Sequence, residues 1–155
     1  MEFKSHIIFG LIVSIIITLS FDEVTFLHGL VIFLASILID VDHYFWYAVR
    51  FKDPNPLNGI KWYLKTNKLF LKMPRGERSN MEKGAFIFHD FIAWLALLIL
   101  GFQIHPFFHY VLIGFAIHII PDLIVLKLRG IQIFSKISFI YVLKTNKNKK
   151  RLPSL

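Results

Sequence analysis

The sequence has no cysteine, which excludes disulfide bonds, thiolate zinc sites and cysteine catalysis. Two short linkers between apolar segments, residues 20–23 and 103–106, contain no Lys or Arg. Acidic residues are few, and the 155-residue chain has a net charge of +8. This positive balance suits anionic lipid or nucleic acid, but nothing in the sequence is typical of sequence-specific nucleic-acid binding.

Apolar residues make up 55% of the chain, and the mean hydropathy is +0.59. A soluble domain of this length cannot bury so much apolar surface, so we expect a bilayer to solvate it. Four apolar segments stand out: His6–Phe21, Val24–Val49, Ala85–Ile104 and Phe107–Leu126. The sequence therefore predicts an all-α fold, a polytopic membrane bundle of four transmembrane helices arranged as two hairpins. We expect one membrane-embedded domain over residues 1–143 and a flexible basic tail over 144–155.

The positions of the basic residues predict the topology. All 18 Lys and Arg residues lie outside the two linkers, at Lys4, within residues 50–83 and within residues 127–151. Basic residues are retained on the cytoplasmic side of membrane proteins. We therefore expect a multi-pass protein of the cell membrane with both termini and residues 50–83 in the cytoplasm.

The stretch after Asn55-Pro56 predicts an amphipathic helix, because Asn can cap a helix and Pro suits its first position. Four lysines recur there at spacings of four, three and four residues and share one helix stripe: Lys61, Lys65, Lys68 and Lys72. We expect these lysines to contact anionic headgroups, with Trp62, Tyr63 and Phe70 in the acyl boundary. A soluble helix that caps the bundle is the alternative. Residues 131–143 predict a second interfacial or packing helix.

Polar residues able to bind a metal ion gather at the predicted cytoplasmic ends of the four apolar segments. They comprise four histidines and four aspartates: His6, Asp40, Asp42, His43, His89, Asp90, His118 and Asp122. Charge next to hydrocarbon is costly, and a metal ion is the commonest partner of a mixed Asp and His cluster. The three other histidines are expected at the opposite side of the membrane: His28, His105 and His109.

Spacing within the segments agrees with a metal site. Two pairs share a helix face because their members lie three or four residues apart: Asp40 with His43, and His118 with Asp122. His89 and Asp90 are adjacent and are expected about one turn into the third segment. One of them would bind metal while the other orients a ligand. The alternative is structural, with each His hydrogen-bonded in packing and each Asp solvated among headgroups.

Several stretches of the chain match one family pattern in order: Lys4-Ser5-His6, Ile39-Asp40-Val41-Asp42-His43, Phe88-His89, and residues 114–122 with His118-Ile119-Ile120-Pro121-Asp122. On these residues the chain resembles the YdjM-type family of predicted membrane-bound metal-dependent hydrolases. That family is thought to be distantly similar to zinc-dependent phospholipase C and P1-type nucleases. The resemblance covers about residues 1–128 and implies metal-dependent hydrolysis.

The chain departs from that family around the third segment, where the pattern reads His-Arg-Gly-x-Thr-His-Ser. Only the second His has a counterpart, His89, and Asp90 stands at the Ser position. Gly84 and Ala85 stand at the first His and the Arg. Nearby charged residues that could replace them are Arg78, Glu82 and Lys83.

We therefore expect a membrane-bound metal-dependent hydrolase of phosphoesters, acting on a lipid-like substrate at the cytoplasmic face. Mixed Asp and His ligation favours Zn²⁺, with Mn²⁺ or Fe²⁺ as alternatives. Asp40 or Asp122 would bridge two ions, and the four histidines would be terminal ligands. Asp42 and Asp90 are the catalytic candidates, Asp42 as general base or as the partner that orients a ligand.

Two other functions remain open at this point. A divalent-cation transporter, for zinc, could use the same residues, although the outer halves of the segments are almost wholly apolar and offer no path. A non-catalytic membrane scaffold could use the metal only to hold its helices together. A haem site is disfavoured because carboxylates crowd the histidines.

Overall fold

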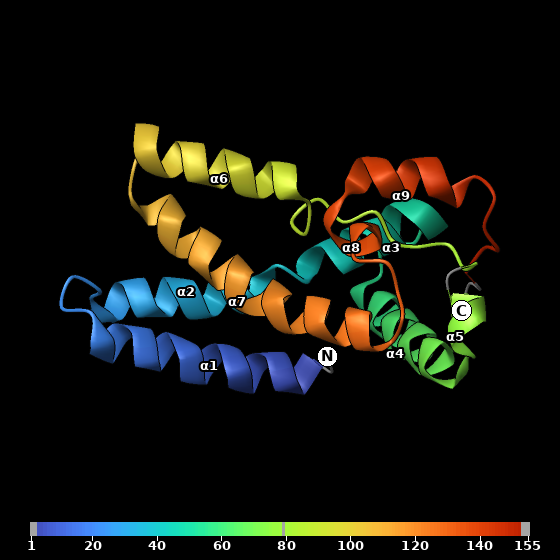
Figure 1. Ribbon diagram of the computed structural model, residues 1–155, viewed down its shortest axis with the longest axis horizontal. Helices are drawn as coiled ribbons and strands as arrows, with labels where there is room; N and C mark the ends of the chain where they lie inside the picture. Colours follow the sequence, from blue (N-terminus) through green and yellow to red (C-terminus); the bar gives the residue numbers. More distant parts are fainter. Residues whose placement is uncertain (1–2, 79, 153–155) are drawn as a thin grey trace. The chain divides into compact units, whose positions relative to one another are not determined.

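The computed structural model describes residues 3–78 and 80–152. Within these ranges the chain is helical and contains no strand, which confirms the all-α prediction. The helices are α1 (Phe3–Ser20), α2 (Phe26–Leu38), α3 (Val41–Phe51), α4 (Pro56–Lys72), α5 (Arg75–Arg78), α6 (Phe91–Gln103), α7 (Phe107–Leu128), α8 (Phe134–Ile137) and α9 (Phe139–Asn146) (Figure 1). They fall into two units. The first comprises Met1–Ile39 and Phe88–Val125, and the second comprises Asp40–Ile87 and Leu126–Leu155.

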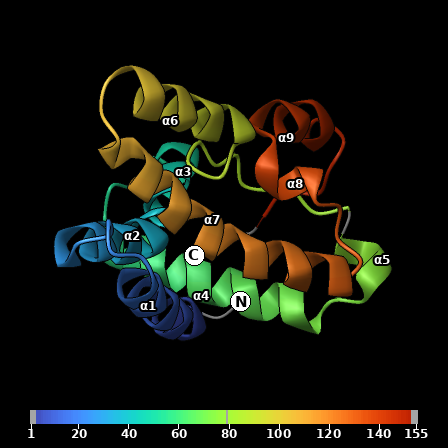
Figure 2. The same cartoon turned by 60° about the vertical axis from the view of Figure 1, so that its left-hand side comes forward.

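In the first unit, α1 and α2 lie side by side as a helical hairpin (Figures 1 and 2). Thr25 begins α2, because its hydroxyl accepts from the backbone N–H of His28 while its own N–H donates to the His28 ring. This reciprocal pair of hydrogen bonds gives partners to the backbone N–H groups of Thr25 and His28 at the start of the helix. The second hairpin joins α6 to α7, and the ring of His105 accepts from the backbone N–H of Phe107 at its turn.

Among the residues that the structure describes, two stretches are long and apolar enough to cross a membrane, Phe26–Phe51 and Phe107–Leu128. The first comprises α2 and α3, which are separated by a turn at residues 39–40. The other two apolar helices are shorter, at Lys4–Ser20 and Phe91–Gln103. The third segment was expected to be helical from Ala85, but α6 begins only at Phe91. The reason is Asp90, whose carboxylate accepts from the N–H of Ile92 and caps the helix there.

The second unit has an aromatic core made by α3, α4 and two later segments. Tyr47, Trp62, Met81 and Leu152 are buried in it. The turn between α3 and α4 is organised by Asp53, whose carboxylate accepts from Tyr47, from the backbone of Asn55 and from Asn58. These bonds, the one from Tyr47 foremost, hold the pKa of Asp53 below its usual value.

Helix α4 begins as its sequence predicts, with Asn55 accepting from the N–H of Leu57 and Pro56 in the first turn. The four lysines of its stripe are all exposed. The expectation that aromatic residues share the outer surface is wrong for Trp62, which is buried in the core, whereas Tyr63 and Phe70 are only partly buried and pack against that core. Aliphatic residues are exposed beside the lysines instead: Leu57, Ile60, Leu64 and Leu71.

The segment after α7 forms two short helices rather than one over residues 131–143. Ser138 separates them, and its hydroxyl accepts from the N–H of Tyr141 at the start of α9. The end of α9 and the residues after it pair with the segment before α6. The side chain of Asn146 bonds both backbone groups of Lys83, and the N–H of Glu82 donates to the carbonyl oxygen of Lys150. The flexibility of the tail stays a prediction, and residues 153–155 lie outside the described residues.

Candidate metal centre

Helix α1 brings His6 to the site through a close approach to α2. A Cβ atom added at Gly10, one turn after His6, would overlap the Ser36 hydroxyl of α2. Only a residue without a side chain leaves this space, so Gly10 fixes how closely the two helices pack. The approach places the buried His6 ring beside the residues that α7 contributes.

Helix α7 approaches α2 in the same way. A Cβ atom at Gly114 would overlap the backbone oxygen of Ile32 and lie 2.6 Å from the Cβ of Ala35. Gly114 lies one turn before His118 and on the same helix face. The close contact allows the His118 ring to reach the backbone of α2, where its Nδ1 lies 2.8 Å from the carbonyl oxygen of Ser36.

The His118–Ser36 bond determines how the His118 ring is used. A carbonyl oxygen only accepts, so Nδ1 of His118 carries the hydrogen and donates. In the neutral ring, Nε2 is then the nitrogen that carries the lone pair. This atom lies 3.8 Å from a carboxylate oxygen of Asp122, one turn further along α7. Backbone carbonyls commonly hold metal-binding histidines in this tautomer.

His6 completes a compact trio with His118 and Asp122. Its Nε2 lies 3.0 Å from the other carboxylate oxygen of Asp122, and its ring stacks on that of His118 with centroids 4.0 Å apart. The three ligand atoms all lie within 4.8 Å of one another. The residues are 5%, 2% and 9% exposed, respectively.

This donor set fits a divalent metal ion. Two imidazole nitrogens and a carboxylate in one place are ligands of the kind that zinc prefers. Nε2 of neutral His118 and the Asp122 carboxylate both offer lone pairs, so a cation bound at this place could be coordinated by both. In addition, Nδ1 of His6 is buried without a hydrogen-bond partner among the residues described. His/Asp groups in this chain are thus geometrically able to bind a metal ion.

His89 belongs to the same unit but not to a helix. It lies in the turn before α6, is fully buried, and its ring stands edge-on to that of His118 at a centroid distance of 5.5 Å. The prediction that His89 and Asp90 lie a turn inside the helix is therefore wrong. The side chain of Asp90, proposed as catalytic, is engaged in the cap of α6.

The remaining predicted site residues lie in the second unit, around His43. Its Nε2 is 3.5 Å from a carboxylate oxygen of Asp40, and its Nδ1 is 3.5 Å from one of Asp42. Asp40 is the residue before α3 and makes no side-chain capping bond, so its carboxylate can turn toward His43. The ammonium of Lys136 also lies 3.5 Å from Nε2 of His43. A cation therefore already faces this imidazole, a contact that the sequence did not indicate.

Five of the eight predicted residues belong to the first unit: His6, His89, His118 and Asp122 gather there, while Asp90 caps α6. The other three, Asp40, Asp42 and His43, belong to the second. The three histidines expected to take no part have other surroundings. His28 stacks on Tyr110, His105 lies at the start of α7, and His109 packs against Gly101 and Phe102.

Of the charged residues considered as replacements for the missing family positions, two are engaged elsewhere. Glu82 accepts two hydrogen bonds from Arg50, at 3.1 and 3.2 Å. The guanidinium of Arg78 donates to the carbonyl oxygens of Met73 and Leu71 at the end of α4.

No family model, curated protein or solved structure matches this chain. The case for a function therefore depends on the residues themselves.

Proposed function

We propose that this protein is a membrane-embedded, metal-dependent hydrolase that acts on phosphoesters. The observation that carries the proposal is the buried trio of His6, His118 and Asp122, whose ligand atoms lie within 4.8 Å of one another. Three protein ligands leave a position for a water molecule or substrate, as in catalytic zinc sites. The resemblance to the YdjM-type hydrolases, stated above, supports the same activity.

The membrane location is supported by the outer faces of the apolar helices. Along α1, large aliphatic side chains are exposed at successive turns: Ile8, Leu11, Ile12, Ile15, Ile16 and Leu19. In the most apolar part of each of the two longer stretches, only 33% and 39% of the residues are buried inside the protein. The core helix of a soluble protein would instead have most of its residues buried. We propose that all four apolar segments enter the bilayer, the two shorter ones with local thinning, and that both termini are cytoplasmic.

In this proposal His6, His118 and Asp122 hold a zinc ion, and His89 lies beside them as a further ligand or as a packing partner of His118. A zinc ion bound there would lower the pKa of a bound water molecule and polarise a phosphoryl oxygen. The chain's own contribution is to keep His118 in the tautomer that presents Nε2, through the Ser36 carbonyl, and to exclude bulk water by burial.

The group around His43 has the chemistry of a proton relay. Its Nδ1 faces the carboxylate of Asp42, and its Nε2 faces both the carboxylate of Asp40 and the ammonium of Lys136. We propose that Asp42 or His43 accepts a proton during hydrolysis, with Asp40 orienting the ring. The exposed lysine stripe of α4 with its neighbouring aliphatic residues would hold the protein against anionic headgroups.

A structural metal is the second candidate function. It is favoured by the burial of the trio, because closed zinc sites that only stabilise a fold are equally buried. Both functions predict zinc binding, and only the first predicts hydrolysis. Activity toward a phosphodiester reporter therefore separates them.

The experiment measures zinc in detergent-purified protein, together with hydrolysis of bis-p-nitrophenyl phosphate. We expect His118→Ala and His6→Ala to lose zinc affinity by about tenfold or more and to lose hydrolysis with it. His28→Ala and His105→Ala are the matched controls, because they remove the same imidazole from the same unit, and should behave like the parent. Zinc should also raise the melting temperature of the parent, by an amount that corresponds to about 2.7 kcal/mol at a hundred times the dissociation constant. An equal loss of zinc affinity in the two control variants would contradict the proposed site. Zinc binding by the parent without any hydrolysis would leave the structural metal as the function.

A further inference from the structure

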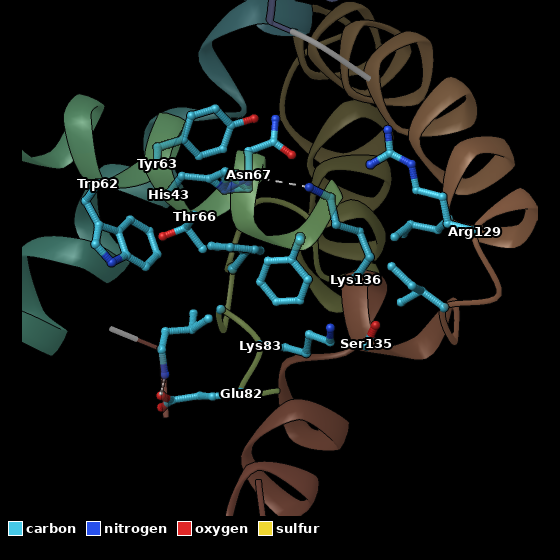
Figure 3. Close-up of a pocket in the computed structure, with 16 residues that line it drawn as sticks. His43, Trp62, Tyr63, Thr66, Asn67, Glu82, Lys83, Arg129, Ser135 and Lys136 are labelled. Carbon is cyan, nitrogen blue, oxygen red and sulfur yellow. Dashed lines mark hydrogen bonds between the residues drawn. The ribbon is translucent and has the colours of Figure 1, made fainter. Parts of the chain in front are cut away.

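The second unit contains a cavity of about 200 Å³. It lies between α4, the segment around residues 82–86, and the stretch from the end of α7 to α8. Trp62 and Tyr63 project from α4, and Lys83 comes from the segment before α6 (Figure 3). Most of the surface inside the cavity is apolar, and its aromatic lining residues are Trp62, Tyr63, Phe70 and Phe86. An apolar cavity of about 150 Å³ can hold benzene, so this one has room for a small aromatic molecule.

Lys83 brings a primary amine to this cavity. Its Nζ donates a hydrogen bond of 2.7 Å to the carbonyl oxygen of Arg78 and lies 4.3 Å from the centre of the Phe70 ring. Within residues 3–78 and 80–152, no carboxylate forms an ion pair with this amine. The carboxylate of Glu82, its neighbour in sequence, accepts two hydrogen bonds from Arg50 instead. Nothing in these two ranges therefore balances the charge of a protonated Lys83 at close range.

The surroundings of Lys83 favour its uncharged form. Burial foremost, then the charges of Lys149 and Arg78, lower the pKa of Lys83 to about 8. The face of an aromatic ring attracts an ammonium ion, so Phe70 opposes this shift in part. Only the uncharged amine has the lone pair that attacks an electrophilic carbon atom. Desolvation next to other cations is how proteins activate a lysine as a nucleophile.

The bond to Arg78 does not prevent such a reaction. An uncharged primary amine has two N–H groups and one lone pair, and the carbonyl oxygen of Arg78 takes one N–H. This bond holds the nitrogen in place and leaves the lone pair for another partner. The cavity wall adds a preference for an apolar partner, because Trp62 is buried in the aromatic core and its position is fixed by packing.

We propose that this cavity binds a small apolar aldehyde and that Lys83 joins it reversibly as an imine. The amine nitrogen attacks the carbonyl carbon, and a C–N bond forms while the carbonyl electron pair moves to oxygen. The two amine hydrogens then leave with that oxygen as water, which gives a C=N bond without any oxidant or reductant. Added water reverses the step.

The product suits the place where it forms. An imine is less basic than an amine, so it stays uncharged where burial and neighbouring cations disfavour an ammonium ion. The apolar walls limit the access of the water that would hydrolyse it. Apolar aldehydes partition into lipid bilayers, so they are available to a protein embedded in a membrane. The site lies in the second unit, and the proposal does not depend on metal binding or hydrolysis by the trio.

The test treats the full-length protein in detergent with benzaldehyde and sodium cyanoborohydride at about pH 8. The cyanoborohydride reduces an imine to a stable amine, and peptide mass spectrometry then identifies each labelled lysine. At this pH the uncharged fraction of Lys83 exceeds that of an ordinary lysine by about a hundredfold, but a less basic amine is also a weaker nucleophile. We therefore expect Lys83 to be labelled about tenfold faster than Lys127, which is exposed and does not line the cavity.

Two controls separate the cavity from reactivity alone. Benzyl alcohol has the same ring but forms no imine, so an excess of it should slow the labelling of Lys83 and leave Lys149 unaffected. Lys149 is the matched lysine, because burial lowers its pKa as well but it does not line the cavity. Glyceraldehyde, which is polar, should show a smaller preference for Lys83 than benzaldehyde does.

The variants complete the test. Lys83→Arg keeps the positive charge and should lose the preferred label, whereas Lys149→Arg should keep it, and melting curves establish that both are folded. Labelling of Lys83 no faster than that of Lys127 would overturn the proposal. So would a lack of protection by benzyl alcohol in the parent protein, or an equal preference for Lys83 with both aldehydes, because the cavity would then play no part.

Discussion

Gly114→Ala should destabilise the protein and weaken its metal site together. The added methyl group would lie 2.6 Å from the Cβ of Ala35 and 3.1 Å from the backbone nitrogen of Ser36. Carbon atoms pack at about 3.5 Å or more, so α2 and α7 would have to separate by about 1 Å. The atoms in the way include backbone of α2, which cannot rotate aside as a side chain can.

The expected cost follows from two opposing terms. Overpacking of this kind costs about 1–3 kcal/mol, and the upper end applies where the obstacle is backbone. Replacing Gly by Ala inside a helix regains about 1 kcal/mol. The net loss is therefore about 2 kcal/mol. Because Ser36 lies at the same contact and its carbonyl orients His118, zinc affinity should fall with the stability.

The assay is thermal unfolding in detergent with and without zinc, together with a zinc-binding titration. Gly76→Ala is the matched control, because a methyl group there meets nothing within 4 Å, and it should change stability by less than about 0.5 kcal/mol. Gly10→Ala should be milder than Gly114→Ala, since its nearest obstacle is the Ser36 hydroxyl rather than backbone. The reasoning fails if Gly114→Ala unfolds and binds zinc like the parent.

Two other predictions concern the second unit. Because the pKa of Lys83 is lowered to about 8, this lysine binds fewer protons in the folded state than in the unfolded state between pH 8 and 10.5, so its contribution to stability should increase as the pH rises through that range. NMR titration of ¹³C-methylated lysines should show one resonance with a titration midpoint near pH 8, and Lys83→Arg should remove that resonance. Replacing the four α4 lysines by Gln should weaken binding to anionic vesicles by about 1 kcal/mol for each charge, with more effect at low salt. Replacing the same four lysines by Arg keeps the charge, so that variant should bind like the parent. Equal binding of the two variants would refute the interfacial role of α4.

Much of the trio could be predicted from local sequence. His118 and Asp122 lie four residues apart on an apolar helix, and that spacing alone puts them on one face. The prediction that His6 lies beside them depends on the hairpin topology, which follows from the positions of the basic residues. Hydropathy and charge therefore carried the prediction further than any motif did.

The errors came from competition between local interactions that hydropathy does not register. The apolar run around Asp90 predicts a helix that includes it, but an Asp also caps helices, and here the cap forms instead. The aromatic residues of α4 suit a membrane interface and an aromatic core equally. Residues from distant parts of the sequence decide the matter, because Met81 and Leu152 complete a core around Tyr47 and Trp62. The proximity of Lys136 to His43 is likewise a tertiary contact across 93 residues of sequence.

The residues most informative about the candidate site are not ligands but the small residues next to them. Gly10 lies four residues after His6, and Gly114 four residues before His118, so each glycine is one turn from a histidine on the same helix face. Both glycines contact α2 around Ser36, whose carbonyl then accepts from His118. Larger residues at either position would hold the helices apart, and the two imidazole rings could not stack at 4.0 Å. A glycine one turn from a histidine on each of two apolar helices is therefore a sequence signal for this convergence, and its physical basis is the space that the absent side chains leave.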